Sequence, residues 1–328
     1  MKRCLIMILT FVQVVFVAMS QQVVWQPDVI KALTPEWTGE RYDDGRPKVP
    51  DALLERLKNC AFEEIQSYLR QQGYRNVFEN FTGLNENGWH IIHPERVMTG
   101  RALTAQFMPM RPDFNNYVQA QAEKEGTHVP VTNYAPIIKL QEGDIYVADS
   151  YGKIEGGTLI GSNLANAIAR AGKRGVIFNG SLRDYEGLEE IGETFNGWIR
   201  GYDPSGIEQM MTAWVNAPIR IGRITILPGD AILAKKLGIA VIPPHLLHDC
   251  VVFCEYITLR DQFSFHCIHT NRFPYINEAF VVDRDVYEKA FLEWLNTQEL
   301  PMPREELDAF LKKREEERAA RSKNRPGS

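Results

Sequence analysis

The chain has 328 residues, of which 44% are hydrophobic and 24% charged, a composition typical of a globular protein with material for one large core or two smaller ones. Its formal net charge of −5 argues against a nucleic-acid-binding protein, because neutralising phosphates requires a basic face. No recognition-helix pattern, zinc-finger spacing or internal repeat is visible, which excludes those architectures as well.

Residues 1–20 have the features of a secretory signal peptide. Lys2 and Arg3 supply the positive start, residues 4–17 an apolar run and residues 18–20 a small-x-small cleavage motif. A retained membrane anchor is the alternative, but the apolar run is short and polar residues interrupt it. We therefore expect an exported protein, periplasmic or secreted, with no stable membrane insertion after cleavage.

Residues 21–50 predict an irregular N-terminal arm. Trp25, Trp37 and several prolines lie in an otherwise polar, charged stretch, so the arm must dock on some surface. It is either a packing strap on its own chain, which we favour, or an arm that reaches over the pocket of a neighbouring subunit.

The rest of the chain predicts a core domain over residues 51–282 and a C-terminal helical extension with a charged tail over residues 283–328. Pro50 precedes a helical pattern that starts at Asp51, runs through Leu69 and ends by Gly73. Other expected elements are strand-like runs and turns over residues 97–149, a Gly- and aromatic-rich loop over 192–204, strands near 219–226, 231–234 and 239–242, and helices from His245, over 283–297 and from Arg304.

The central stretch, residues 143–190, reads as strand, glycine turn, helix and strand. An apolar run at residues 145–148 predicts the first strand, and residues 163–171 predict a helix that Gly172 closes in a left-handed cap. A second strand at residues 176–178 leads to Arg183 and Asp184.

This order predicts that the helix start at Gly161-Ser162-Asn163 and the Arg183-Asp184 pair lie at the same end of a sheet, where α/β folds bind ligands. A helix N-terminus favours anions, a guanidinium binds oxyanions, and a carboxylate is a ligand for a hard divalent cation. An anionic, metal-chelating substrate fits this set. The structural alternative is a buried Arg–Asp pair that closes a turn.

Four cysteines follow the predicted signal peptide: Cys60, Cys250, Cys254 and Cys267. Export permits disulfides, and the even number permits pairing. Neighbouring histidines suggest zinc, but the spacings match no zinc template, so core thiols or a disulfide are the favoured alternatives.

Several separated motifs resemble those of the RraA-like family, which includes the class II 4-hydroxy-4-methyl-2-oxoglutarate / 4-carboxy-4-hydroxy-2-oxoadipate aldolases and the regulator of ribonuclease E activity A. The resemblance covers roughly residues 51–265. The motifs, in order, are GRALT at 100–104, GDIYVAD at 143–149, GSNLA at 161–165, G-x-x-G-V-I-x-N-G-x-x-R-D at 172–184, and PGD at 228–230 with Gly238 and VIP at 241–243.

The resemblance implies an α/β fold, a β/β/α three-layer sandwich of the swivelling-domain type, assembled as a homotrimer or homohexamer. By that resemblance, Asp184 holds Mg2+, or another divalent cation such as Mn2+, largely through waters. Arg183 binds the keto oxygen of a 2-oxo acid. Gly161 and the amides of Ser162, Asn163 and Leu164 bind its carboxylate.

Two positions depart from the aldolase pattern, in which an acid stands where this chain has Ser162 and another where it has Gly187. The first acid is the expected base of retro-aldol cleavage, and a serine cannot replace it. Glu155, Glu186 and Glu189 are the candidate substitutes.

We therefore predict a divalent-metal-dependent carbon–carbon lyase, an aldolase or oxaloacetate-type decarboxylase, with decarboxylation the more robust activity because it needs no base. The alternatives are an exported lyase or isomerase acting on sugar acids from polysaccharide breakdown, and a non-catalytic RraA-like binding protein. A methyltransferase is disfavoured, because the chain has no nucleotide-binding glycine loop after a first strand.

Overall fold

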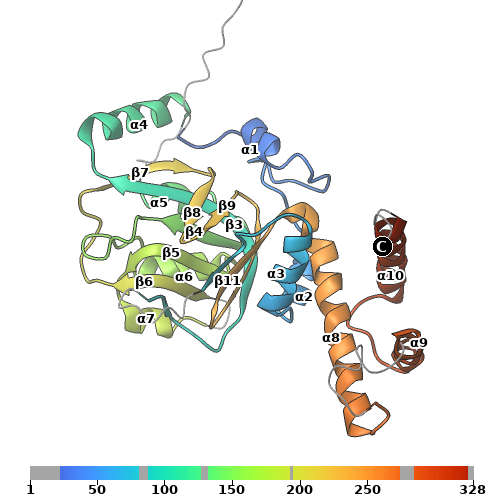
Figure 1. Ribbon diagram of the computed structural model, residues 1–328. Coiled ribbons are helices and arrows are strands. Elements are labelled where there is room, and N and C mark those ends of the chain that lie inside the picture. The colour runs from blue at the N-terminus through green and yellow to red at the C-terminus, as the bar shows by residue number, and fades with distance from the viewer. Residues whose placement is uncertain (1–22, 81–87, 127–131, 193–194, 274–283, 324–328) are drawn as a thin grey trace, which may run out of the picture.

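A mixed nine-stranded sheet forms the centre of the computed structural model, which describes residues 23–80, 88–126, 132–192, 195–273 and 284–323 (Figure 1). The predicted signal peptide lies outside the described residues. Along the sheet the order is β1-β11-β10-β3-β4-β5-β6-β2, with β7 also paired to β3. The strands of the sheet are β1 (Phe78–Asn80), β2 (His90–Ile91), β3 (Met98–Pro109), β4 (Asp144–Asp149), β5 (Gly175–Leu182), β6 (Asn196–Tyr202), β7 (Met210–Val215), β10 (Ala231–Lys235) and β11 (Gly238–Ile242), and β8 (Ile219–Ile221) and β9 (Ile224–Ile226) form a separate hairpin.

Strands β3, β4, β5 and β6 are parallel neighbours, and the remaining pairings are antiparallel. On β4, Tyr146 and Ala148 belong to one hydrophobic cluster, and Ile145 and Val147 belong to another. Successive side chains of a strand point to opposite faces, so β4 is buried on both sides. This double burial explains the continuous apolar run in the sequence.

The two faces of the sheet at β4 are covered differently, one by helices and the other by a β-hairpin. The first cluster includes Val118, Ala165 and Ile168, from helices near the parallel strands, and the second includes the isoleucines of the β8–β9 hairpin. The helices are α1 (Pro27–Leu33), α2 (Asp51–Leu57), α3 (Phe62–Gln71), α4 (Pro112–Lys124), α5 (Tyr134–Ile137), α6 (Ser162–Arg170), α7 (Tyr185–Glu189), α8 (Leu247–His269), α9 (Arg284–Leu295) and α10 (Arg304–Lys323), with a 3-10 turn at Pro244–Leu246.

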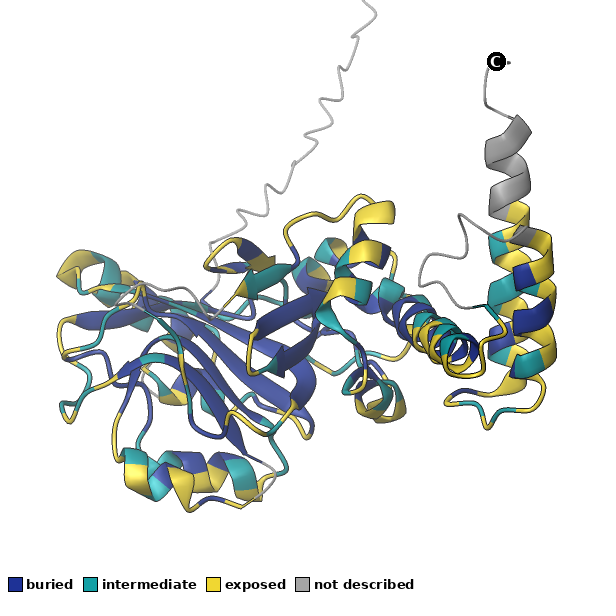
Figure 2. Cartoon of the chain, turned by 60° about the horizontal axis from the view of Figure 1, so that its bottom comes forward, coloured by how far each residue is buried: buried dark blue, intermediate teal, exposed yellow. Residues whose placement is uncertain are grey.

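The long helix α8 joins the sheet to the C-terminal extension. One side of it packs with α2, α3 and strands β10 and β11, through residues such as Leu54, Leu233 and Val251. Another side forms a separate cluster with α9 and α10, which includes Phe263 and Phe291. The extension thus has its own small core and projects away from the sheet (Figure 2).

The N-terminal arm is bound to its own chain. The backbone N–H of Trp25 donates to the carbonyl of Val215 at 3.0 Å. Arg46 is fully buried, and its guanidinium lies 2.7 Å from Asp44 and 2.8 Å from the equally buried Asp144 on β4. Burial opposes the charge of Arg46, but the two carboxylates outweigh it and raise its pKa. These contacts are those of a packing strap.

Three expectations for the elements need correction. The predicted loop at residues 192–204 is wrong, because Asn196–Tyr202 form strand β6, which pairs with β5. The run over 97–149 contains helix α4, and the helix expected from Asp51 to Leu69 is two helices separated at residues 58–61.

The four cysteines of the described residues, Cys60, Cys250, Cys254 and Cys267, are free and buried, which matches the core-thiol alternative rather than a disulfide. Every helix in the described part of the chain is too short or too polar to span a membrane.

Candidate active site

Arg183 and Asp184 follow the carboxyl end of β5 and lie against the amino end of α6. The backbone N–H of Ser162 donates to Oδ2 of Asp184 at 3.2 Å, and the Ser162 hydroxyl lies 3.4 Å from the same oxygen. Nε of Arg183 lies 3.8 Å from that oxygen. Both charged side chains are about half exposed, at 47% and 49%, so they are not the buried ion pair of the structural alternative.

Gly161 permits this approach. A Cβ atom at this position would lie 2.5 Å from Oδ2 of Asp184 and 3.1 Å from Nε of Arg183, both shorter than ordinary contacts. The backbone φ of Gly161 is −121°, which other residues adopt freely. The need for glycine therefore comes from the packing of the two charged side chains and not from the backbone.

Asp184 has a left-handed backbone conformation, with φ 57° and ψ 45°. This region is unfavourable for non-glycine residues, although Asp tolerates it better than most, and such residues concentrate at functional sites. The turn redirects the chain from β5 into α7, for which Asp184 is the N-cap residue. It fixes the carboxylate beside α6.

The two departures from the aldolase pattern are neighbours in space. A Cβ atom built on Gly187 would lie 2.9 Å from Cβ of Ser162 and 3.5 Å from its hydroxyl oxygen. Neither residue carries a carboxylate, so the acids that the aldolase pattern has at these two positions are absent. The candidate substitutes Glu155, Glu186 and Glu189 are all solvent-exposed.

The first turn of α6 offers backbone donors. The N–H groups at the start of a helix have no acceptor within the helix. Asp184 already accepts the N–H of Ser162, so the amides of Asn163 and Leu164 are the ones that remain for a substrate carboxylate. The apolar side chain of Leu164 packs against the core, while Asn163 is exposed.

Asp184 is the one predicted metal ligand. Among the residues that the structure describes, no group of three or more His, Cys, Asp or Glu side chains is arranged to hold a metal ion. Mg2+ commonly binds through one or two carboxylates and retains several waters. A single exposed carboxylate beside substrate-binding donors fits a cation completed by water and substrate, and it does not fit a cage built of protein ligands.

The predicted site residues thus come together at the surface rather than in a closed cavity. A hollow with a volume of about 640 Å3 lies elsewhere and is lined by Asp43, Lys139 and other residues between the arm and the segment before β4. These residues were not predicted as a site. The sequence offered only the aromatic and charged composition of the arm as a signal.

Comparisons with known proteins agree with the motifs. Protein DlpA of Legionella pneumophila is 29% identical over 212 residues, which cover 64% of this chain but only 30% of DlpA. RraAS2 of Streptomyces coelicolor, described as an unusual member of the RNase ES inhibitor RraA protein family, shares the fold at a TM-score of 0.55 and 23% identity, covering 67% of this chain and 99% of its own. An uncharacterised protein of Pseudomonas syringae pv. tomato also has a TM-score of 0.55, at 16% identity, covering 75% and 100%.

These similarities confirm the α/β fold. The RraA-like family model, described as Aldolase/RraA, matches residues 51–241, which is more than half of the chain. The protein therefore belongs to the RraA-like family, whose members include aldolases and ribonuclease inhibitors.

Proposed function

We propose that this chain is a divalent-metal-dependent carbon–carbon lyase that acts on a 2-oxo acid, with oxaloacetate-type decarboxylation as its main reaction. One observation carries the proposal: the Asp184 carboxylate accepts the N–H of Ser162 at the helix N-terminus at 3.2 Å and lies 3.8 Å from the guanidinium of Arg183. We further propose that it works as an exported homotrimer or homohexamer.

Each group has a role that its chemistry suits. The amides of Asn163 and Leu164 bind the substrate carboxylate next to the keto group, with the helix dipole in support. The guanidinium of Arg183 donates to the keto oxygen and stabilises the negative charge that develops there as the bond breaks. A divalent cation such as Mg2+ or Mn2+, held by Asp184 with waters, would supply Lewis-acid polarisation of that oxygen.

Decarboxylation requires little else from the protein. The bond between C3 and the departing carboxylate breaks, CO2 leaves, the electron pair moves toward the keto oxygen, and C3 later takes a proton from solvent. Retro-aldol cleavage must in addition remove a hydroxyl proton, which calls for a positioned base. Ser162 and Gly187 provide no such base, so the site favours decarboxylation.

The same absence of an acid supports one competing role, a non-catalytic binding protein. RraAS2 is described as belonging to a family of ribonuclease inhibitors. The two roles differ in a simple assay, because a binding protein releases no pyruvate from oxaloacetate above the background rate.

The test is pyruvate release from oxaloacetate by the purified chain, measured with Mg2+ and with EDTA. We expect Mg2+ to raise the rate above the metal-only background, and Asp184→Asn to lower it by about 100-fold, the loss typical when a metal's supporting groups or a charge-stabilising donor is removed. Asp113→Asn, an exposed carboxylate on α4, is the matched control and should leave the rate unchanged. Pyruvate release that is insensitive to both Mg2+ and Asp184→Asn contradicts the proposal.

A further inference from the structure

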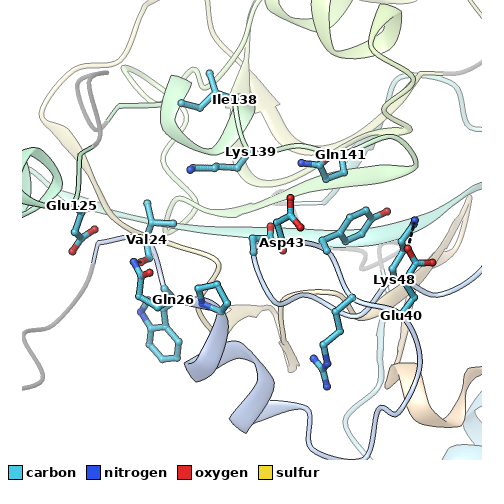
Figure 3. A pocket seen from close by; sticks show the side chains of 14 residues that line it. Val24, Gln26, Glu40, Asp43, Lys48, Glu125, Ile138, Lys139 and Gln141 are labelled. Atoms are coloured by element: carbon cyan, nitrogen blue, oxygen red, sulfur yellow. Dashed lines mark hydrogen bonds and ion pairs between the residues drawn. The ribbon is translucent and has the colours of Figure 1, made fainter.

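A polar hollow of about 640 Å3 separates the N-terminal arm from the segment that leads into β4 (Figure 3). It lies near the amino end of β4, whereas Arg183 and Asp184 follow the carboxyl end of the parallel strand β5. The hollow therefore lies at the opposite end of the parallel strands from the candidate active site. Its lining residues are Val24, Trp25, Gln26, Pro27, Glu40, Arg41, Tyr42, Asp43, Asp44, Lys48, Glu125, Ile138, Lys139 and Gln141.

Hydrogen bonds and an ion pair within the chain fix the side of the hollow that the N-terminal arm forms. The guanidinium of Arg41 donates to the carbonyls of Thr34, Trp37 and Gly45 at 2.7–3.1 Å. Asp44 binds the fully buried Arg46. A wall fixed by such contacts presents its outward groups in one geometry, which is a requirement for a specific binding site.

Three polar side chains in the hollow remain uncommitted. Within the described residues, the side chains of Asp43, Lys139 and Gln141 form no hydrogen bond or ion pair, whereas neighbouring side chains of the lining do. Lys139 and Gln141 extend from the wall opposite the one that carries Asp43 and Gln26 (Figure 3). A donor, an acceptor and a cation therefore face one shared space.

The charges of the lining restrict the ligand. Arg41 is bound to carbonyls and Lys48 is paired with Glu40 at 2.7 Å, so Lys139 is the available cation of the described lining. Of the four lining carboxylates, Glu40 is paired with Lys48 and Asp44 with Arg46. The carboxylates of Asp43 and Glu125 form no ion pair in the described residues and would repel a phosphate or another multiply charged anion. A single negative charge together with hydroxyl groups matches this set.

We propose that this hollow binds a sugar acid, a polyhydroxylated monocarboxylate of monosaccharide size. The ammonium of Lys139 takes the carboxylate, and Asp43 and Gln141 hydrogen-bond the hydroxyls. The side chains of Trp25 and Ile138 give an apolar surface for the C–H face of the ring. The volume lies within the ~300–1,000 Å3 typical of small-molecule sites.

The experiment is an NMR titration of the full chain with D-glucuronate, with D-glucose and pyruvate as comparison ligands. We expect saturable binding of glucuronate that pyruvate does not displace, and weaker binding of glucose, which lacks the carboxylate. Lys139→Met should weaken glucuronate binding about tenfold or more, as expected for loss of one charge-assisted hydrogen bond, and leave glucose binding unchanged. Asp43→Asn should weaken both sugars.

The matched control is Lys312→Met, an exposed lysine on α10, which should bind glucuronate like the parent chain. Thermal unfolding of each variant checks that the fold is intact. Three outcomes overturn the proposal: no saturable binding of glucuronate, the same affinity in Lys139→Met as in the parent, or loss of glucuronate binding in Asp184→Asn with displacement by pyruvate. The last outcome would assign the sugar acid to the candidate active site and leave the lyase proposal standing.

Discussion

Asp184 and Gly161 act together at the scale of single residues. Asp184 accepts a left-handed backbone that places its carboxylate beside α6, and Gly161 leaves the space that the carboxylate occupies. The geometry on which the proposed chemistry depends is thus set by one strained residue and by one missing side chain. Each half of this arrangement can be changed separately.

Gly161→Ala should displace the carboxylate of Asp184. The added methyl group would lie 2.5 Å from Oδ2, so the aspartate must move, while the backbone of residue 161 accepts alanine. We expect oxaloacetate decarboxylation to fall by about tenfold or more, because misplacing a catalytic group by about 1 Å is expensive, with a melting temperature close to that of the parent. Gly206→Ala, where an added Cβ meets no atom within 4 Å, is the control. Unchanged kinetics in Gly161→Ala would show that the position of Asp184 is not critical.

Ser162→Glu tests whether a missing base limits aldol cleavage. The new carboxylate would stand at the first turn of α6, next to Asp184, where the aldolase pattern has an acid. We expect it to give measurable pyruvate release from 4-hydroxy-4-methyl-2-oxoglutarate, while Ser162→Gln, of the same size but without basicity, gives none. A general base typically contributes about 100-fold or more, which sets the sensitivity that the assay needs. Equal rates in the two variants would contradict the assignment.

At the scale of elements, the sequence predicted those helices and strands that their own residues determine. The apolar run at 145–148 predicted β4, because a strand buried on both faces has no polar alternation. The stretch Asn196–Tyr202 was predicted as a loop because its glycines disfavour a strand. Its aromatic residues favour one, and the pairing with β5 supplies the hydrogen bonds that make it a strand. Strand pairing of this kind is non-local, and composition alone does not contain it.

Some contacts of the candidate site could likewise be predicted from the sequence, and others could not. The meeting of Arg183–Asp184 with the α6 start follows from the order of strand, helix and strand, so chain order sufficed to predict it. The contact between Ser162 and Gly187 depends on how α7 packs against α6, and the sugar-acid hollow depends on where the arm docks. Neither contact follows from a hydrophobic periodicity in the sequence. The sequence therefore identified Ser162 and Gly187 as departures from the aldolase pattern but did not predict that they are in contact.

The turn before β10 contains a carboxyl group that should make stability depend on pH. Asp230 is 4% exposed, and burial raises its pKa to about 7, although its Oδ2 accepts the N–H of Leu227 at 2.8 Å. A carboxyl whose pKa is raised on folding binds more protons in the folded state, so its stabilising contribution is present at low pH. That contribution is lost as pH rises from the unfolded value near 4 toward 7.

We therefore expect Asp230 to lower the free energy of unfolding by roughly 1.4 kcal/mol per pH unit within this window. Asp230→Asn keeps an acceptor for the Leu227 amide but does not titrate, so the difference in unfolding free energy between parent and variant should change with pH between about 4 and 7. Urea unfolding at several pH values measures it. A difference that stays constant across the window would mean that the buried carboxyl does not titrate there.

For the whole molecule, the decisive question is what covers the candidate active site. In a single chain Arg183 and Asp184 are about half exposed, and charge stabilisation of the proposed kind is strongest where water is excluded. A second subunit in a ring-shaped trimer or hexamer would provide that cover, and activity would then depend on assembly. We expect sedimentation velocity to show a trimer or hexamer of the chain and the decarboxylation rate per chain to fall when dilution dissociates it. Full activity in a monomer would mean that the open surface suffices, and the lyase would then act with its charged pair in contact with solvent.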